Sequence, residues 1–136
     1  MFGMMRNPTQ SYATVGVDVA VGTSDPHKLI LMLFDGAISA VSIARMHMTQ
    51  GHIAEKGTNI SKAISLISDG LKASLDLEAG GELAERLSVL YDYMAQRLLF
   101  ANLKNNIAAL DEVHDLLAGL REAWAQIPAS PEQAAA

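Results

Sequence analysis

The chain has 136 residues, half of them hydrophobic but only 5% aromatic, with no cysteine and a formal net charge of −5. This length suits one domain with a sizeable core, and the lack of cysteine excludes disulfide bonds and thiol catalysis. The negative charge argues against a general nucleic-acid-binding protein, because binding phosphates requires clustered Lys and Arg. The apolar content is mostly Leu, Ile, Ala and Met, which favours packed helices over a β-sandwich.

Residues 1–24 show no sustained hydrophobic period. They contain Pro8, three glycines and several Ser and Thr residues, so we expect a flexible N-terminal arm. Four valines between residues 15 and 21 alternate as in a strand, but a lone strand has no pairing partner. The arm lacks the features of a secretory signal peptide, and no segment has the roughly 20 uninterrupted apolar residues of a membrane span. We therefore expect a cytoplasmic protein without a membrane span.

Four segments with a helical hydrophobic period follow the arm. The first begins at Pro26, behind Asp25, whose side chain can accept the free amide protons of a first turn. It stops at Gly51, the second stops at the Gly80-Gly81 pair, and Pro128 ends the fourth. The predicted helices span residues 26–50, 53–78, 82–104 and 106–127.

The connections between these segments are very short, which forces neighbouring helices to run antiparallel. We therefore predict an all-α fold, an antiparallel up-down-up-down four-helix bundle over residues 25–127, followed by a disordered C-terminal tail over 128–136. Trp124 is expected to pack partly near the end of the fourth helix. A glycine inside a helix costs about 1 kcal/mol relative to alanine, so we expect Gly36 to mark a tight helix crossing.

The second and third predicted helices carry more apolar surface than a bundle core needs. Leu87, Met94 and Leu98 belong to the core stripe of the third helix, and a second apolar arc lies beside it. The candidate residues of this surplus surface are Leu66, Ala73, Leu77, Val89, Tyr93, Phe100 and Leu103. One interpretation is a wide stripe tucked between neighbouring helices. The other is a hydrophobic groove for a partner helix, where small residues such as Gly70 permit close approach.

Patterns for catalysis or metal binding are missing from the sequence. His27, His47, His52 and His114 are the only imidazoles, and none belongs to a Glu-x-x-His or His-Glu-x-x-His motif. We expect surface or capping roles for all of them. No Gly-rich phosphate loop, nucleophile elbow or Cys/His metal spacing is present. We therefore predict no enzyme, no cofactor and no metal site, and the missing inward Glu/His set disfavours a metal-binding four-helix bundle enzyme.

Five stretches, in kind, order and spacing, resemble a known family. They are DPHKLILMLFDGA (25–37), KAISLISDGL (62–71), GGELAERLSVLYDYM (80–94), RLLFANLKN (97–105) and EVHDLLAGLREAW (112–124). The family is that of the flagellar secretion chaperone FliS, and the resemblance covers nearly the whole chain from Tyr12 to Trp124. Most family members carry Tyr where this chain has Phe34, so any hydrogen bond of that hydroxyl is absent here.

The resemblance implies a chaperone of flagellar type III export that works in the cytoplasm. Its client would be the C-terminal region of flagellin, which is disordered in the monomer and helical in the filament. Covering the apolar face of that region would prevent premature polymerisation, without ATP or a cofactor. The resemblance therefore favours the groove over the wide core stripe.

In this family the N-terminal arm packs on the bundle and carries a Tyr that matches Tyr12. We therefore expect Tyr12, Val15 and Val19 to cover the groove when no client is bound. The alternative is a self-assembling structural or adaptor bundle that buries its surplus stripes in a homodimer. We expect a monomer or a weak homodimer that binds no nucleic acid. Other flagellar regulatory or export proteins, such as an anti-sigma factor or a co-chaperone, stay open as further partners.

Overall fold

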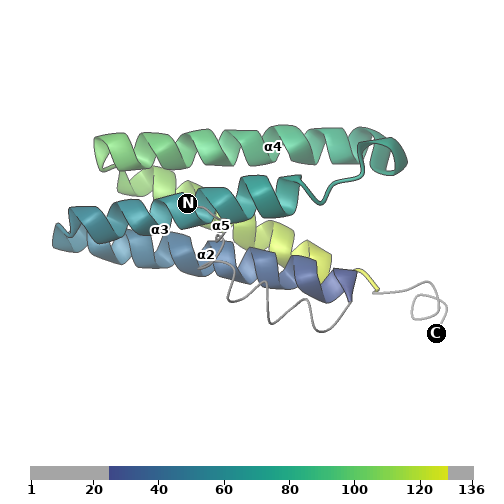
Figure 1. Cartoon of the computed structure of the whole chain (residues 1–136), viewed down its shortest axis with the longest axis horizontal. Helices are drawn as coiled ribbons and strands as arrows, with labels where there is room; N and C mark the ends of the chain where they lie inside the picture. The colour runs from purple at the N-terminus through teal and green to yellow at the C-terminus, as the bar shows by residue number, and fades with distance from the viewer. Residues whose placement is uncertain (1–24, 129–136) are drawn as a thin grey trace, which may run out of the picture.

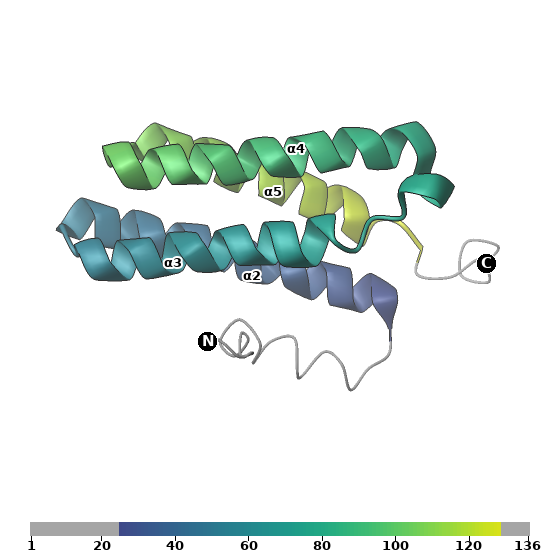
Figure 2. The same ribbon diagram turned by 45° about the horizontal axis from the view of Figure 1, so that its top comes forward.

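The computed structural model of the chain describes residues 25–128, and this part forms a bundle of four helical rods (Figure 1). Each rod packs against its neighbours in the sequence, and the last rod closes the ring on the first. Neighbouring rods run antiparallel in both views (Figures 1 and 2), so the predicted all-α four-helix bundle is confirmed. The rods are α2 (Pro26–Gln50), α3 (Ile53–Ser65) with its continuation η1 (Leu66–Lys72), α4 (Leu77–Lys104) and α5 (Ile107–Ala125).

Local sequence signals set both ends of α2. The Asp25 carboxylate accepts hydrogen bonds from the backbone amides of His27 and Lys28 at 3.1 and 3.3 Å, and Pro26 takes the first helical position. At the other end Gly51 adopts a left-handed conformation with φ of 76°. Both features agree with the sequence-based prediction, because they depend on residues that are adjacent in the chain.

One hydrophobic core runs through the bundle and draws on every rod. The part of α2 that faces α3 is lined by Ala37, Ala40 and Ala44, which are fully or almost fully buried. Such small side chains let the two helix axes approach closely. The largest fully buried side chains are Val41, Ile60, Ile67, Leu71, Met94, Leu98, Leu110, Val113 and Leu117. Each of them stabilises the fold by about 1.5–3 kcal/mol.

Two glycines mark the crossing of α2 with η1. A Cβ added to Gly36 would lie 3.2 Å from Cδ1 of Leu66, and one added to Gly70 would lie 2.9 Å from Cδ2 of Leu33. The tight crossing expected at Gly36 is therefore confirmed. Gly70 serves the same contact from the other side, so it faces α2 and not an open groove.

The predicted end of the second helix at Glu78 is wrong. The rod ends at Lys72 as a π-helix, and Leu77 and Glu78 already belong to α4. The reason is Asp76, whose carboxylate accepts the backbone amides of Glu78 and Ala79 at 3.1 and 3.0 Å and so starts a new helix. The predicted break at the glycine pair is a kink inside α4, at Gly81 with φ of 56° and ψ of −134°.

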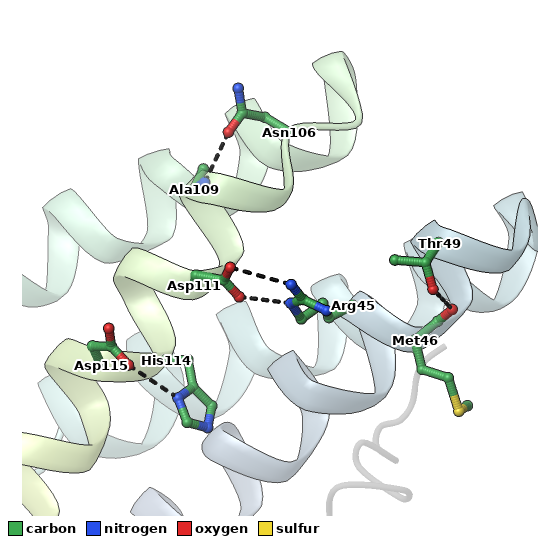
Figure 3. Close-up of polar contacts among 8 residues, drawn as sticks. All are labelled: Arg45, Met46, Thr49, Asn106, Ala109, Asp111, His114 and Asp115. Atoms are coloured by element: carbon green, nitrogen blue, oxygen red, sulfur yellow. Dashed lines mark hydrogen bonds and ion pairs between the residues drawn. The ribbon is translucent and has the colours of Figure 1, made fainter.

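Ion pairs on the rim join α5 to α2. Arg45 donates to both carboxylate oxygens of Asp111, at 2.7 and 3.4 Å (Figure 3), and Arg121 donates to Asp35 at 3.0 Å. These groups are about half exposed, so each pair contributes about 0–1 kcal/mol. The amide side chain of Asn106 caps α5 by accepting the backbone amide of Ala109 at 2.8 Å. Trp124 packs against the core near the end of α5, as expected.

Among the described helices α2 alone is long and apolar enough, by length and composition, to cross a membrane. This is weak support for a membrane span, because a core helix of a bundle has the same properties. Its alanine face and Phe34 lie in the bundle core, which accounts for its composition.

Candidate functional site

Four large apolar side chains lie exposed in line along the outer face of α4. Their exposed fractions are 69% for Val89, 42% for Tyr93, 39% for Phe100 and 79% for Leu103. The spacing of four, seven and three residues keeps them on one side of the helix. We call these four residues the α4 stripe. Because the core is filled without them, the stripe is apolar surface that a partner can cover.

A cluster of polar contacts with α5 fixes the two rings of the stripe. The Tyr93 hydroxyl donates to Oε2 of Glu112, and Nε of Arg97 donates to Oε1 of the same carboxylate at 2.8 Å. The Arg97 guanidinium also lies 4.8 Å from the centre of the Phe100 ring, a cation–π arrangement. We call Tyr93, Arg97 and Glu112 the Glu112 clamp. It holds the rings in place before any partner arrives.

The clamp also changes the acid–base properties of its members. The hydrogen bonds from Tyr93 and then Arg97 lower the pKa of Glu112, because they favour its ionised form. The bond to Glu112 is likewise the main reason why the pKa of Tyr93 is raised. Glu112 is therefore ionised at neutral pH, and the clamp is intact there.

The other predicted groove residues do not continue the α4 stripe. Leu66 is only 7% exposed and packs on Gly36 in the core, Ala73 lies in the connection behind η1, and Leu77 opens α4. A wheel drawn at 3.6 residues per turn misplaces these residues, because the hydrogen bonds of a π-helix span five residues and widen each turn. The predicted groove shared between the second and third helices is thus not formed.

A second apolar feature, the end pocket, lies where α2 begins and α5 ends, and sequence reasoning missed it. Its volume is about 390 Å³. It is left open because the second rod stops at Lys72, and the first turn of α4 then stands at an angle to the rest of that helix (Figures 1 and 2). The pocket is lined by Ile30, Phe34, Leu71, Ser74, Leu75, Asp76, Gly80, Leu83, Ala84, Leu87, Tyr91, Leu120, Ala123, Trp124 and Ile127.

Two rings close one wall of the end pocket. His27 and Trp124 stack with their centroids 5.2 Å apart and their planes at 17°. Trp124 Nε1 donates to the backbone carbonyl of His27 at 3.0 Å, and Nε2 of His27 lies 2.9 Å from the carbonyl oxygen of Trp124. These reciprocal contacts tie the start of α2 to the end of α5, residues that are 97 positions apart, which no sequence pattern could indicate.

Tyr91 is the buried polar residue of this pocket. It is only 4% exposed, and its hydroxyl makes no hydrogen bond within residues 25–128. Burial raises the pKa of Tyr91 to about 12. A buried hydroxyl without a partner is unusual, because leaving a donor unsatisfied costs about 1–3 kcal/mol.

The histidines do not form a recognisable metal centre in the described part of the chain. His47 and His52 face each other across the α2–α3 turn with their Nδ1 atoms 3.1 Å apart, and Nδ1 of His114 lies 3.5 Å from Asp115 (Figure 3). Within residues 25–128 no group of three or more His, Cys, Asp or Glu side chains is placed to hold a metal ion. The predicted arm residues Tyr12, Val15 and Val19 lie outside the described residues.

Comparison with known proteins identifies the family. The profile of the family described as flagellar protein FliS matches residues 8–131. The flagellar secretion chaperone FliS of Salmonella typhimurium is 54% identical over 118 residues, which cover 87% of either chain. Its namesake in Escherichia coli K12 is 43% identical over 123 residues, 90% of either chain. That of Vibrio cholerae is 38% identical over 124 residues, 91% of this chain and 90% of the relative.

A match over nearly the whole length agrees with the all-α bundle and with the apolar surface that the bundle leaves exposed. The role that these names state is that of a chaperone in flagellar export, which is not an enzymatic one. The chain therefore belongs to the FliS family of flagellar secretion chaperones.

Proposed function

We propose that this protein binds the C-terminal region of flagellin in the cytoplasm and holds it unpolymerised until export. The single observation that supports this most is the α4 stripe, a row of large exposed side chains with two ordered rings. A partner helix with an apolar face at helical spacing would cover such a row. The family role as a flagellar secretion chaperone gives the direction of the proposal.

The physical logic follows from the client. A segment that becomes helical in the filament has an apolar face made to pair with neighbouring subunits, so leaving it free invites premature assembly. Folding on the chaperone costs roughly 2–5 kcal/mol of ordering, which the burial of apolar surface has to exceed. A stripe that is already ordered reduces the ordering cost on the chaperone side, since each newly immobilised side chain costs about 0.5–1.5 kcal/mol.

Replacing Tyr93 and Phe100 together by alanine tests the proposal. We expect the affinity for a peptide covering the flagellin C-terminal region to fall by about 1–3 kcal/mol, the scale of interface hot spots. The melting temperature should change little, because both rings lie outside the core. Isothermal titration calorimetry and thermal melts would be run on the same samples.

A matched control is the double substitution of Ile43 and Met46 by alanine. These side chains are exposed to a similar degree, 38% and 46%, but they lie on α2, and Figure 3 shows Met46 directed away from α5. The control should bind the peptide as the wild type does. If the stripe variant melts much earlier with unchanged affinity, the rings are structural and the proposal is wrong. If sedimentation instead shows a stable dimer that the stripe variant abolishes, the self-assembling bundle is the better interpretation.

A further inference from the structure

We propose that the end pocket is a second docking site for the same client. Large apolar side chains of a client segment fill it, and the Tyr91 hydroxyl donates a hydrogen bond to an oxygen of that segment. This inference rests on the proposed function and extends it, since the stripe alone says nothing about the end of the bundle.

The lining and the mouth of the pocket argue for a peptide segment as the occupant. Leu83 and Ile127 belong to the lining, yet they stay 67% and 49% exposed. Filling the cavity of about 390 Å³ with a small molecule would leave these side chains in water. A chain segment that inserts side chains and continues across the mouth would cover both, and burial of such area is favourable by about 25 cal/mol per Å².

Continuity along α4 indicates that one client can reach both surfaces. Leu87 and Tyr91 line the pocket, and the α4 stripe starts at Val89, between them in the sequence. A client helix that follows the stripe therefore arrives at the pocket end of the bundle. Ala84, on the same helix, also lines the pocket and is buried.

Tyr91 adds a chemical requirement to this apolar site. Its hydroxyl lies among carbon atoms and has no partner in the described residues, so the free protein bears the desolvation penalty of that group. A client oxygen placed against the hydroxyl would remove the penalty only in the complex. The hydroxyl then contributes to binding and not to folding, which is the opposite of what a structural tyrosine does.

Substituting Tyr91→Phe in the full-length chain separates these roles, because it removes only the oxygen. We expect affinity for the flagellin C-terminal peptide to fall about fivefold, the loss of one ordinary hydrogen bond. The melting temperature of the free protein should stay equal or rise. Tyr93→Phe is the comparison for stability: it removes a hydroxyl that already donates to Glu112, so its melting temperature should fall.

A second variant fills the pocket without touching the core. Ala123 lines the cavity and is exposed, so Ala123→Phe places a ring in the mouth of the pocket. We expect at least a tenfold loss of affinity with an unchanged melting temperature. The matched control is Ala54→Phe, an exposed alanine in the first turn of α3 at the other end of the bundle, which should bind as the wild type.

The outcomes distinguish this inference from the proposed function. If the wild type binds the peptide and the Tyr91→Phe and Ala123→Phe variants bind equally well, the pocket is no client site, while the proposed function stands. If the wild type itself does not bind, both fall. A drop in the melting temperature of free Tyr91→Phe would show that the hydroxyl already has a partner within the chain, for example in the arm, and would overturn the inference.

Discussion

Replacing Lys56 by methionine tests how the end of α4 is held in place. Lys56 lies in α3 and is only 5% exposed. Its ammonium donates to the backbone carbonyl of Asn102 at 3.0 Å and to Oδ1 of Asn105 at 2.5 Å. Asn105 is the left-handed cap residue of α4, with φ of 50°. The cation thus meets the carbonyl end of the helix, where the helix dipole also favours positive charge.

The magnitude is a difference between two opposing terms. A hydrogen bond from a charged group contributes about 1.5–3 kcal/mol, so the two bonds together contribute about 3–6 kcal/mol. Burial of the ammonium opposes this by several kcal/mol. Methionine keeps an apolar stem of similar length, so little packing is lost. Since the ammonium keeps two good acceptors, we expect a net destabilisation of about 1–3 kcal/mol, within the usual range for a broken buried polar contact.

Urea unfolding followed by circular dichroism would measure this loss. For a domain of this size, about 2 kcal/mol corresponds to roughly 8 °C in melting temperature. Lys62→Met is the matched control on the same helix; its side chain is exposed, so its effect should stay within about 0.5 kcal/mol. If Lys56→Met is as stable as the wild type or more stable, desolvation outweighs the two bonds and the reasoning is refuted.

Three further predictions concern the arm, the clamp and the helix glycines. Deleting residues 1–21 should raise affinity for the flagellin peptide, because a cover that competes with the client lowers the competent fraction; titration calorimetry measures this, and hydrogen exchange should show the arm amides losing protection as client is added. The bond from Tyr93 and the Arg97 contact lower the pKa of Glu112, so its ionised form stabilises the fold above the unfolded pKa and this is lost as pH falls through the folded pKa. The stability advantage over Glu112→Gln at pH 7 should therefore fade below about pH 4 in denaturation curves. Gly57→Ala should stabilise by about 0.5–1 kcal/mol because an added Cβ meets nothing within 4 Å, whereas Gly70→Ala should destabilise because its Cβ would lie 2.9 Å from a leucine methyl of α2.

Each of these expectations has a clear contrary result. Arm amides that start unprotected, or that gain protection with client, would show that the arm is no displaceable cover. A difference between the wild type and Glu112→Gln that is the same at pH 3 and pH 7 would show that the carboxylate does not stabilise the fold through its charge. Equal effects of the two glycine substitutions would mean that the α2–η1 crossing can relax.

Sequence reasoning succeeded where the physical cause is local. The Asp25-Pro26 start and the Gly51 stop of α2 depend on adjacent residues, and the structure has both. The end of the second helix failed for a comparable reason. Asp76 is an equally good helix start, but the neighbouring glycine pair was taken as the break, although Gly81 only kinks a helix that has already begun.

The residues that sequence reasoning missed depend on contacts between distant segments. Lys56 has the pattern of any surface lysine, and only the approach of α3 to the end of α4 buries it. Tyr91 carries no signal either, because an apolar helix position does not show whether a hydroxyl finds a partner. The α4 stripe was visible as surplus apolar surface, but its separation from Leu66 required the π-helix, which shifts the facing of every residue behind it.

The exposed apolar surface is compatible with a stable fold because folding and binding use different sides of α4. Met94 and Leu98 are fully buried on the inner side, and the stripe is left over on the outer side. An exposed ring usually adds freedom that binding then has to remove, at about 0.5–1.5 kcal/mol for each side chain. The Glu112 clamp removes much of that freedom in advance, through bonds that the folded bundle makes anyway. Substitutions at Glu112 should therefore weaken client binding without touching the contact surface, by loosening the rings that the client meets.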